Sequence, residues 1–253
     1  GVTTLTGAVA VGDFRGTAET ITVTGTVNDQ ALAATTTILR CNNATLLTIT
    51  GFASGTAGRI LIVQSVGAGQ VDLRHQNTGS AAANRLINFA TSGNTPLAAA
   101  SGVAIYYYDG TQSRWVLLQH EQGAWIVPTF AAGDFTANGA MTWTVAAGDV
   151  DSFAYRLCGR TLSVNFFLST TTVGGTLNSQ LLMGNGQWGS FTSTRTMRNL
   201  MSGTDNAVLL NDAVVQSAAS GTTLACQKNN AADNWTAATD NTRVAGTITF
   251  EVN

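Results

Sequence analysis

Residues 102–118, GVAIYYYDGTQSRWVLL, constrain the fold of this chain most strongly, because they have the pattern of two β-strands around a turn. Apolar and aromatic side chains fill both alternating sets of positions, whereas a half-exposed hairpin would alternate apolar with polar residues. Asp109-Gly110 supplies the turn, since glycine accepts the positive φ that such turns need. The pattern therefore predicts a hairpin covered on both faces, either inside a packed β structure or at a subunit contact.

Shorter segments with strand character recur about every ten residues on both sides of this hairpin, separated by Asn, Gly and Ser. No segment combines the length and the spacing of a helix, so the sequence predicts an all-β protein. The predicted strands before the hairpin are 36–40, 46–50, 59–66, 70–74 and 85–89, and those after it are 140–145, 152–157, 160–169, 180–183, 195–201, 207–210, 213–217, 222–227 and 243–252.

The regular spacing breaks at residues 119–127, which precede Pro128. Each half of a 253-residue chain is large enough for its own core. We therefore expect two β-sandwich or jelly-roll-like domains in tandem. Their predicted bounds are an extended lead-in over 1–19, a structural and trimerising sandwich over 20–120, a linker over 121–127 and a jelly-roll head over 128–253.

Charge is scarce: Asp, Glu, Lys and Arg make up 10% of the residues, against about 25% in ordinary soluble domains. A monomer with so few surface charges would be poorly soluble, so we expect oligomerisation to bury part of the surface. The net charge of −2 and the absence of a basic run give no reason to expect nucleic acid. No apolar segment reaches the roughly 20 residues of a membrane helix, so no membrane insertion is expected. Cys41, Cys158 and Cys226 are odd in number and far apart, which favours small buried apolar residues over a disulfide framework.

Two stretches resemble proteins of phage particles. The first half carries Ala83-Asn84-Arg85, Tyr108-Asp109-Gly110 and Ser113-Arg114-Trp115 in the order of a β-module of phage tail-fibre and head-fibre proteins. The second half, from residue 128 to residue 253, is similar to the jelly-roll tips of phage fibres and spikes. The resemblance implies a trimeric appendage on the surface of the phage particle. Other virion proteins would attach through the N-terminal segment, and the distal domain would contact a host-surface receptor, commonly a glycan.

Residues for catalysis are few. A Ser-His-acid hydrolase needs a histidine base, but His75 and His120 are the only histidines and no G-x-S-x-G motif accompanies them. Glycoside cleavage needs two carboxylates about 5–10 Å apart. The nearest sequence pairs, Asp149/Asp151 and Asp205/Asp212, fall around turns, where Asp accepts backbone N–H groups. We therefore predict a protein that is not an enzyme and has no cofactor; a metal on an oligomer axis stays an open alternative.

Saccharide binding uses exposed aromatic rings beside amide and carboxylate groups. Gln187 and Trp188 lie in the loop GNGQWGS, and Asn234 and Trp235 lie in KNNAADNWTAATDN, so these four are the candidate binding residues. The alternative for both tryptophans is that each closes an end of the sandwich. Core or interface positions are expected for the remaining tryptophans, Trp115, Trp125 and Trp143.

The sequence thus favours a non-enzymatic virion fibre or spike protein that binds a host-surface saccharide. A capsid decoration or head fibre that stabilises the particle is the first alternative. A polysaccharide depolymerase is the second.

Overall fold

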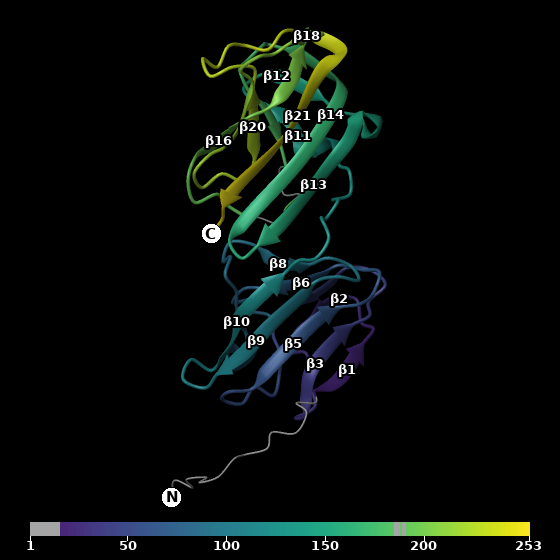
Figure 1. The fold of residues 1–253 in the computed structure, drawn as a ribbon, viewed down its shortest axis with the longest axis vertical. Coiled ribbons are helices and arrows are strands. Elements are labelled where there is room, and N and C mark those ends of the chain that lie inside the picture. Colours follow the sequence, from purple (N-terminus) through teal and green to yellow (C-terminus); the bar gives the residue numbers. More distant parts are fainter. Residues whose placement is uncertain (1–15, 185–187, 189–190) are drawn as a thin grey trace, which may run out of the picture.

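The computed structural model describes residues 16–184, 188 and 191–253, and it confirms an all-β architecture. Two sandwiches follow one another along the chain, the N-terminal one in the lower half of Figure 1 and the C-terminal one above it. Helical structure in these residues is limited to three single turns, η1 (Ala82–Asn84), η2 (Ala132–Asp134) and η3 (Ala147–Asp149). No helix among the described residues has the length and apolarity needed to cross a bilayer.

The N-terminal sandwich consists of a six-stranded and a four-stranded sheet. The larger sheet has the order β1 (Thr17–Ile21), β3 (Thr36–Cys41), β5 (Ile60–Ser65), β9 (Val103–Asp109), β10 (Arg114–Glu121) and β7 (Leu86–Ile87). The smaller sheet has the order β2 (Gly25–Val27), β4 (Leu47–Ile49), β6 (Val71–Arg74) and β8 (Asn94–Leu97).

The chain winds through this sandwich in parallel coils, which the sequence analysis did not anticipate. It alternates between the two sheets, so β1, β3 and β5 pair in parallel in one sheet and β2, β4 and β6 pair in parallel in the other. Equivalent positions of successive coils therefore stack, as Ile21, Cys41 and Ser65 do. The antiparallel strands β9 and β8 then pair with the last coil. The sequence carries no motif that recurs from coil to coil, so it gave no signal of this winding.

The C-terminal sandwich is antiparallel at every strand pairing found in the described residues. One sheet has the order β12 (Met141–Thr144), β14 (Thr161–Gly175), β21 (Ala238–Glu251), β17 (Ser202–Asp205) and β18 (Val208–Leu209), with β13 (Val150–Cys158) also paired to β14. The facing sheet has the order β11 (Phe135–Ala137), β15 (Leu181–Met183), β20 (Leu224–Gln227), β19 (Val214–Ser217) and β16 (Met197–Leu200). The long strands β14 and β21 pair along most of their length and form the spine of the domain (Figure 1).

Each sandwich encloses its own hydrophobic cluster. The N-terminal cluster runs from Leu32 to Leu117, and the C-terminal cluster runs from Phe135 to Val252 with Ala90 added from the first half. Trp115 is fully buried in the first cluster, where its ring meets Phe52 edge-on and its Nε1–H donates to the Phe52 carbonyl at 2.8 Å. The predicted core or interface positions of Trp115 and Trp143 are therefore core positions.

The hairpin at residues 102–118 forms as predicted, with β9 and β10 antiparallel. Its inner side chains, including Tyr106 and Trp115, are fully buried against the smaller sheet. Its outer side chains, among them Ile105 and Val116, remain partly exposed in the single chain. The single chain thus buries the inner side of the hairpin fully and its outer side in part, and a subunit contact at the outer side stays a prediction.

The segment predicted as a linker contacts both sandwiches. Gln122 is completely buried; its Oε1 accepts the Leu157 amide at 2.7 Å, and its Nε2 donates to the Tyr155 carbonyl at 3.2 Å. A second connection joins Ser92 of the first half to Asn253 of the second half. The Ser92 backbone N–H and hydroxyl both donate to the Asn253 carbonyl. The two sandwiches are therefore joined by buried and directional contacts.

Candidate functional site

The two tryptophans proposed as saccharide platforms are buried. Trp188 and Trp235 are each 1% exposed, Trp188 packs beside Phe153, and Trp235 Nε1 donates to the carbonyls of Ser179 and Cys226. A ring with no exposed face cannot stack on a sugar, and the burial of both rings agrees with the stated alternative, in which each closes an end of the sandwich. Asn234 is exposed beside Trp235 without an aromatic platform, and Gln187 lies outside the described residues.

The tryptophan that does reach the surface is Trp125, which is 42% exposed and was expected in the core or at an interface. It lines a shallow hollow of about 380 Å³ together with Ser152, Asn165 and Thr247. Asn165 is already engaged there, because it accepts from Ser152 at 2.8 Å and donates to Thr247 at 3.0 Å. These polar groups satisfy one another, which leaves fewer directions for a ligand.

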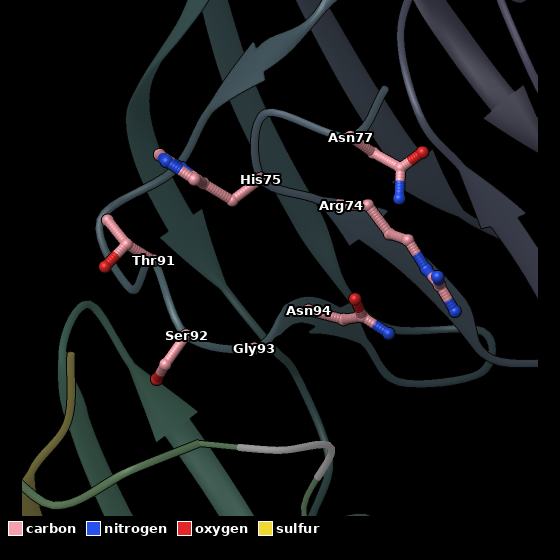
Figure 2. Close-up of a pocket in the computed structure, with 7 residues that line it drawn as sticks. All are labelled: Arg74, His75, Asn77, Thr91, Ser92, Gly93 and Asn94. Carbon is pink, nitrogen blue, oxygen red and sulfur yellow. The ribbon is translucent and has the colours of Figure 1, made fainter. Parts of the chain in front are cut away.

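A more open set of polar groups surrounds a pocket of about 380 Å³ on the N-terminal sandwich (Figure 2). Two segments form it, the end of β6 with the turn that follows and the loop leading into β8. In Figure 2 the Arg74 side chain points away from His75 and runs between Asn77 and Asn94. The pocket is lined by Arg74, His75, Asn77, Thr91, Ser92, Gly93 and Asn94.

Strand alternation explains why these side chains face outward. Val71 and Leu73 of β6 are fully buried, so Asp72 and Arg74 project from the outer side of the smaller sheet. The residue opposite Arg74 on β8 is Asn94, which places its amide beside the guanidinium. This alternation was visible in the sequence as QVDLR, and it was the signal available for the site.

Arg74 carries unused hydrogen-bonding capacity. Its Nε atom is buried and has no hydrogen-bond partner among the described residues. The nearby Asp72 is held by Gln70 at 2.5 Å and Asn94 at 3.1 Å, while burial raises the pKa of this carboxyl against those bonds and the charge of Arg74. Asp72 is thus committed to its own neighbours, and the guanidinium can donate to a ligand oxygen.

His75 is held as a neutral ring. Its Nδ1 accepts the Asn88 backbone N–H at 3.0 Å, which leaves Nε2 as the protonated nitrogen. Burial lowers the pKa of His75 below its usual value. The ring therefore presents an N–H donor without a charge at neutral pH, which suits recognition of a hydroxyl group.

The carboxylates considered for catalysis have structural partners. Asp149 accepts the Ala146 amide and the Thr170 hydroxyl, and Asp151 accepts the Ser169 hydroxyl. Asp205 is 6% exposed and pairs with Lys228 at 3.0 Å. None of these contacts leaves a pair of free carboxylates facing a common space.

Metal and thiol chemistry find little support in the part of the chain that the structure describes. These residues contain no group of three or more His, Cys, Asp or Glu placed to hold a metal ion. Cys41 and Cys226 are buried as expected, and burial raises the pKa of Cys41 to about 12. Cys158 is exposed, contrary to the expectation, because it ends β13 at a turn where alternation points it outward.

No protein-family model matches this chain, and no curated protein matches it. The polar pocket and the arrangement of the two sandwiches are therefore the basis for a functional assignment.

Proposed function

We propose that this chain is a non-enzymatic virion fibre or spike protein that attaches a phage particle to a saccharide on the host surface. The ligand would occupy the polar pocket beside Arg74. The protein would act as a homotrimer on the particle surface, with other virion proteins bound through its N-terminal segment.

The observation that carries this proposal is the polar lining of the pocket. A guanidinium, two amides, a neutral imidazole and two hydroxyl side chains line one hollow of about 380 Å³. Two of these groups also have partners within the chain, since Asn94 donates to Asp72 and the Ser92 hydroxyl donates to the Asn253 carbonyl. Saccharides present many hydroxyl groups in fixed directions, and such a set of donors and acceptors can satisfy them. The Arg74 guanidinium lines the pocket and adds a charge-assisted donor for a sugar carboxylate or hydroxyl oxygen, although its Nε atom is itself buried.

The mechanism would be multivalent binding. A shallow, solvent-exposed site of this size supports weak affinity, on the order of millimolar for one copy. Several identical sites on one particle raise the effective concentration, so avidity exceeds single-site affinity by about 100-fold or more. Weak single-site binding would then still give stable adsorption.

A glycan array probed with the full chain tests the ligand class. The Arg74→Ala variant should lose most of the signal because it removes the charged group that lines the pocket, whereas Arg198→Ala on the distant strand β16 should retain it. Arg198 is the matched control, since it is exposed and its guanidinium donates to Gln216 and Asn230, away from the pocket. Equal signals from wild type and Arg74→Ala would contradict the pocket assignment.

Two alternatives remain distinguishable. A capsid decoration or head fibre predicts density on the capsid lattice in cryo-electron microscopy of the particle, whereas an attachment fibre predicts density at the tail. A depolymerase predicts new reducing ends when the protein is incubated with host polysaccharide, and release of sugar would overturn the non-enzymatic part of the proposal.

A further inference from the structure

The outer side of the six-stranded sheet is apolar at its centre. Two rows of side chains cross β5, β9 and β10, one through Ile60, Tyr107 and Val116 and the next through Ile62 and Ile105 to the bulge at Leu118. Ile60 is 47% exposed and Leu118 is 52% exposed, and the other side chains are partly exposed. We call these six residues the apolar face: Ile60, Ile62, Ile105, Tyr107, Val116 and Leu118.

The outer sheet surface of the C-terminal sandwich, in contrast, is polar. On the C-terminal sandwich, outward side chains of β13, β14 and β21 pair as hydroxyls and amides, for example Ser163 with Thr249 and Asn165 with Thr247. Such polar ladders are suited to water. The apolar face has no comparable polar ladder, so it needs a partner surface.

A polar row borders the apolar face and has opposite charges at its ends. The row passes from Arg40 on β3 through Gln64 and Val103 to Glu121 on β10. Arg40 is exposed, and the Glu121 side chain is 48% exposed although it pairs with Arg156. The cation therefore marks one side of the face and the anion marks the other.

We infer that the apolar face is the contact between copies of this chain, related by a rotation axis parallel to the strands. Such an axis lies over the middle of the sheet, between β5 and β9, because β3, β5, β9 and β10 are consecutive neighbours. A two-fold rotation about it lays β5 of one copy over β9 of the other and β3 over β10, without shifting any row along the strands. Arg40 then meets Glu121 of the second copy, and Ile62 meets Ile105.

A three-fold axis in the same direction would turn the β3 side of each copy toward the β10 side of the next, with the edge strands β1 and β7 between them. The charge pattern thus favours a second copy of the chain over an unrelated partner, since one surface supplies both halves of the match. The direct pairing of Arg40 with Glu121 belongs to the two-fold arrangement.

The size of the surface agrees with this assignment. The three strands that carry the apolar face, spaced about 4.8 Å apart with about six residues each, cover roughly 300 Å² in plan. The largest apolar patch on a typical monomer covers about 300–600 Å² and often has a function. The apolar rows would form the centre of the interface, and the charged row would form part of its polar rim.

The inference deepens the oligomeric part of the proposed function and is independent of its ligand. The pocket beside Arg74 lies on the outer side of the other, four-stranded sheet. Copies joined through the apolar face would therefore leave every pocket open.

The test is the mass of the full chain in solution, measured by light scattering and sedimentation equilibrium. The wild type should be oligomeric, and Ile62→Asp with Ile105→Asp should dissociate it, since facing like charges replace facing apolar groups. Leu200→Asp is the matched control, because Leu200 is 74% exposed on β16 and lies outside the apolar face. A monomeric wild type, or equal masses for the apolar-face variant and the control, would overturn the inference.

Charge reversal provides a second test with side chains that the fold does not bury. Arg40→Glu alone should weaken association about tenfold or more, and combining it with Glu121→Arg should restore it. Restoration by the double variant requires the two positions to meet across the interface. An Arg40→Glu variant that associates like wild type would overturn the proposed pairing.

The two proposals fail in different ways. If Arg74→Ala abolishes glycan binding while the wild type is monomeric, the apolar-face inference is wrong and the ligand assignment stands. If the wild type is an oligomer that dissociates as expected but binds no glycan, the interface stands and the proposed ligand is wrong.

Discussion

The two outer surfaces of the N-terminal sandwich differ in composition although the same coils build both. The six-stranded sheet turns Ile60, Ile62 and Ile105 outward, whereas the four-stranded sheet turns Asp72 and Arg74 outward beside a pocket. Each coil contributes one strand to each sheet, so the contrast is set residue by residue within single coils. One short stretch of chain therefore builds both the surface proposed for assembly and the surface proposed for recognition.

This contrast also shows where on the surface the scarcity of charged residues matters. The chain is not uniformly apolar outside, since the pocket side and the C-terminal sandwich carry dense hydrogen-bonding groups. The outer side of the six-stranded sheet is where polar groups are scarcest. This is the surface that we propose a partner covers.

The largest effects should come from side chains inside the sandwiches. Trp235→Ala should lower the free energy of unfolding by about 3–5 kcal/mol, because it empties a fully enclosed site and leaves two carbonyls without their donor. Trp125→Ala, at a 42% exposed position, should cost much less. Chemical denaturation monitored by circular dichroism measures both. Similar losses for the two variants would contradict the assignment of Trp235 to the core.

Leu61 and Ile62 are adjacent in β5 and point to opposite sides of the sheet, so their substitution tests the inner and the outer side separately. Leu61 is fully buried, so Leu61→Ala should cost about 2–5 kcal/mol of stability at every protein concentration. Ile62→Ala should cost less and chiefly at concentrations where copies associate, because its packing partner belongs to another copy. Denaturation at a series of protein concentrations separates the two. A loss for Ile62→Ala that does not change with concentration would argue against an intermolecular contact.

A substitution in the pocket beside Arg74 should change ligand binding without changing the mass of the oligomer. Arg74→Ala should weaken binding of the saccharide found on the array by about 10–100-fold, which corresponds to the loss of one charge-assisted hydrogen bond of about 1.5–3 kcal/mol. Isothermal titration gives the affinity, and light scattering of the same sample gives the mass. If the substitution also dissociated the oligomer, the two outer surfaces would not be independent.

The smallest expected effect is a change in the pH dependence of stability. Burial lowers the pKa of His75 and His120, so the folded chain takes up these protons less readily than the unfolded chain. The corresponding stability is complete above the unfolded pKa of about 6.5 and is lost as the pH falls below it. His120 contributes because its Nε2 contacts the Pro96 carbonyl at 2.8 Å and its buried Nδ1 has no partner among the described residues.

His120→Gln tests this contribution, since glutamine keeps an N–H donor for Pro96 and does not titrate. The decline in unfolding free energy from pH 7 to 5.5 should be shallower in the variant than in wild type. Thermal melts across that range measure it. Parallel curves would show that His120 does not take part.

Local patterns located most of the strands but not their partners. The hairpin at residues 102–118, the strand at β5 and the turn at Asp109 followed from alternation and turn chemistry. The parallel winding did not, because alternation specifies which side of a strand is buried and is silent on which strand lies beside it. Pro96 lies in β8, which the strand pairing places at the edge of the four-stranded sheet, a position that tolerates proline.

The candidate site was harder to predict than the fold. Trp188 and Trp235 lie in polar, glycine- and asparagine-rich sequence, which suggested exposure, but both rings are buried. The pocket beside Arg74 joins two segments separated by β7, and its members have no shared spacing. Only the pairing of β6 with β8 brings Arg74 and Asn94 together.

The connection between Ser92 and Asn253 has a practical consequence for work with this protein. Ser92 forms part of the pocket wall and binds the Asn253 carbonyl through both its amide and its hydroxyl. Any peptide joined after residue 253, such as an affinity tag or a fluorescent fusion, would start at the rim of the proposed sugar site. Ligand assays should therefore compare tags at both chain ends before a negative result is accepted.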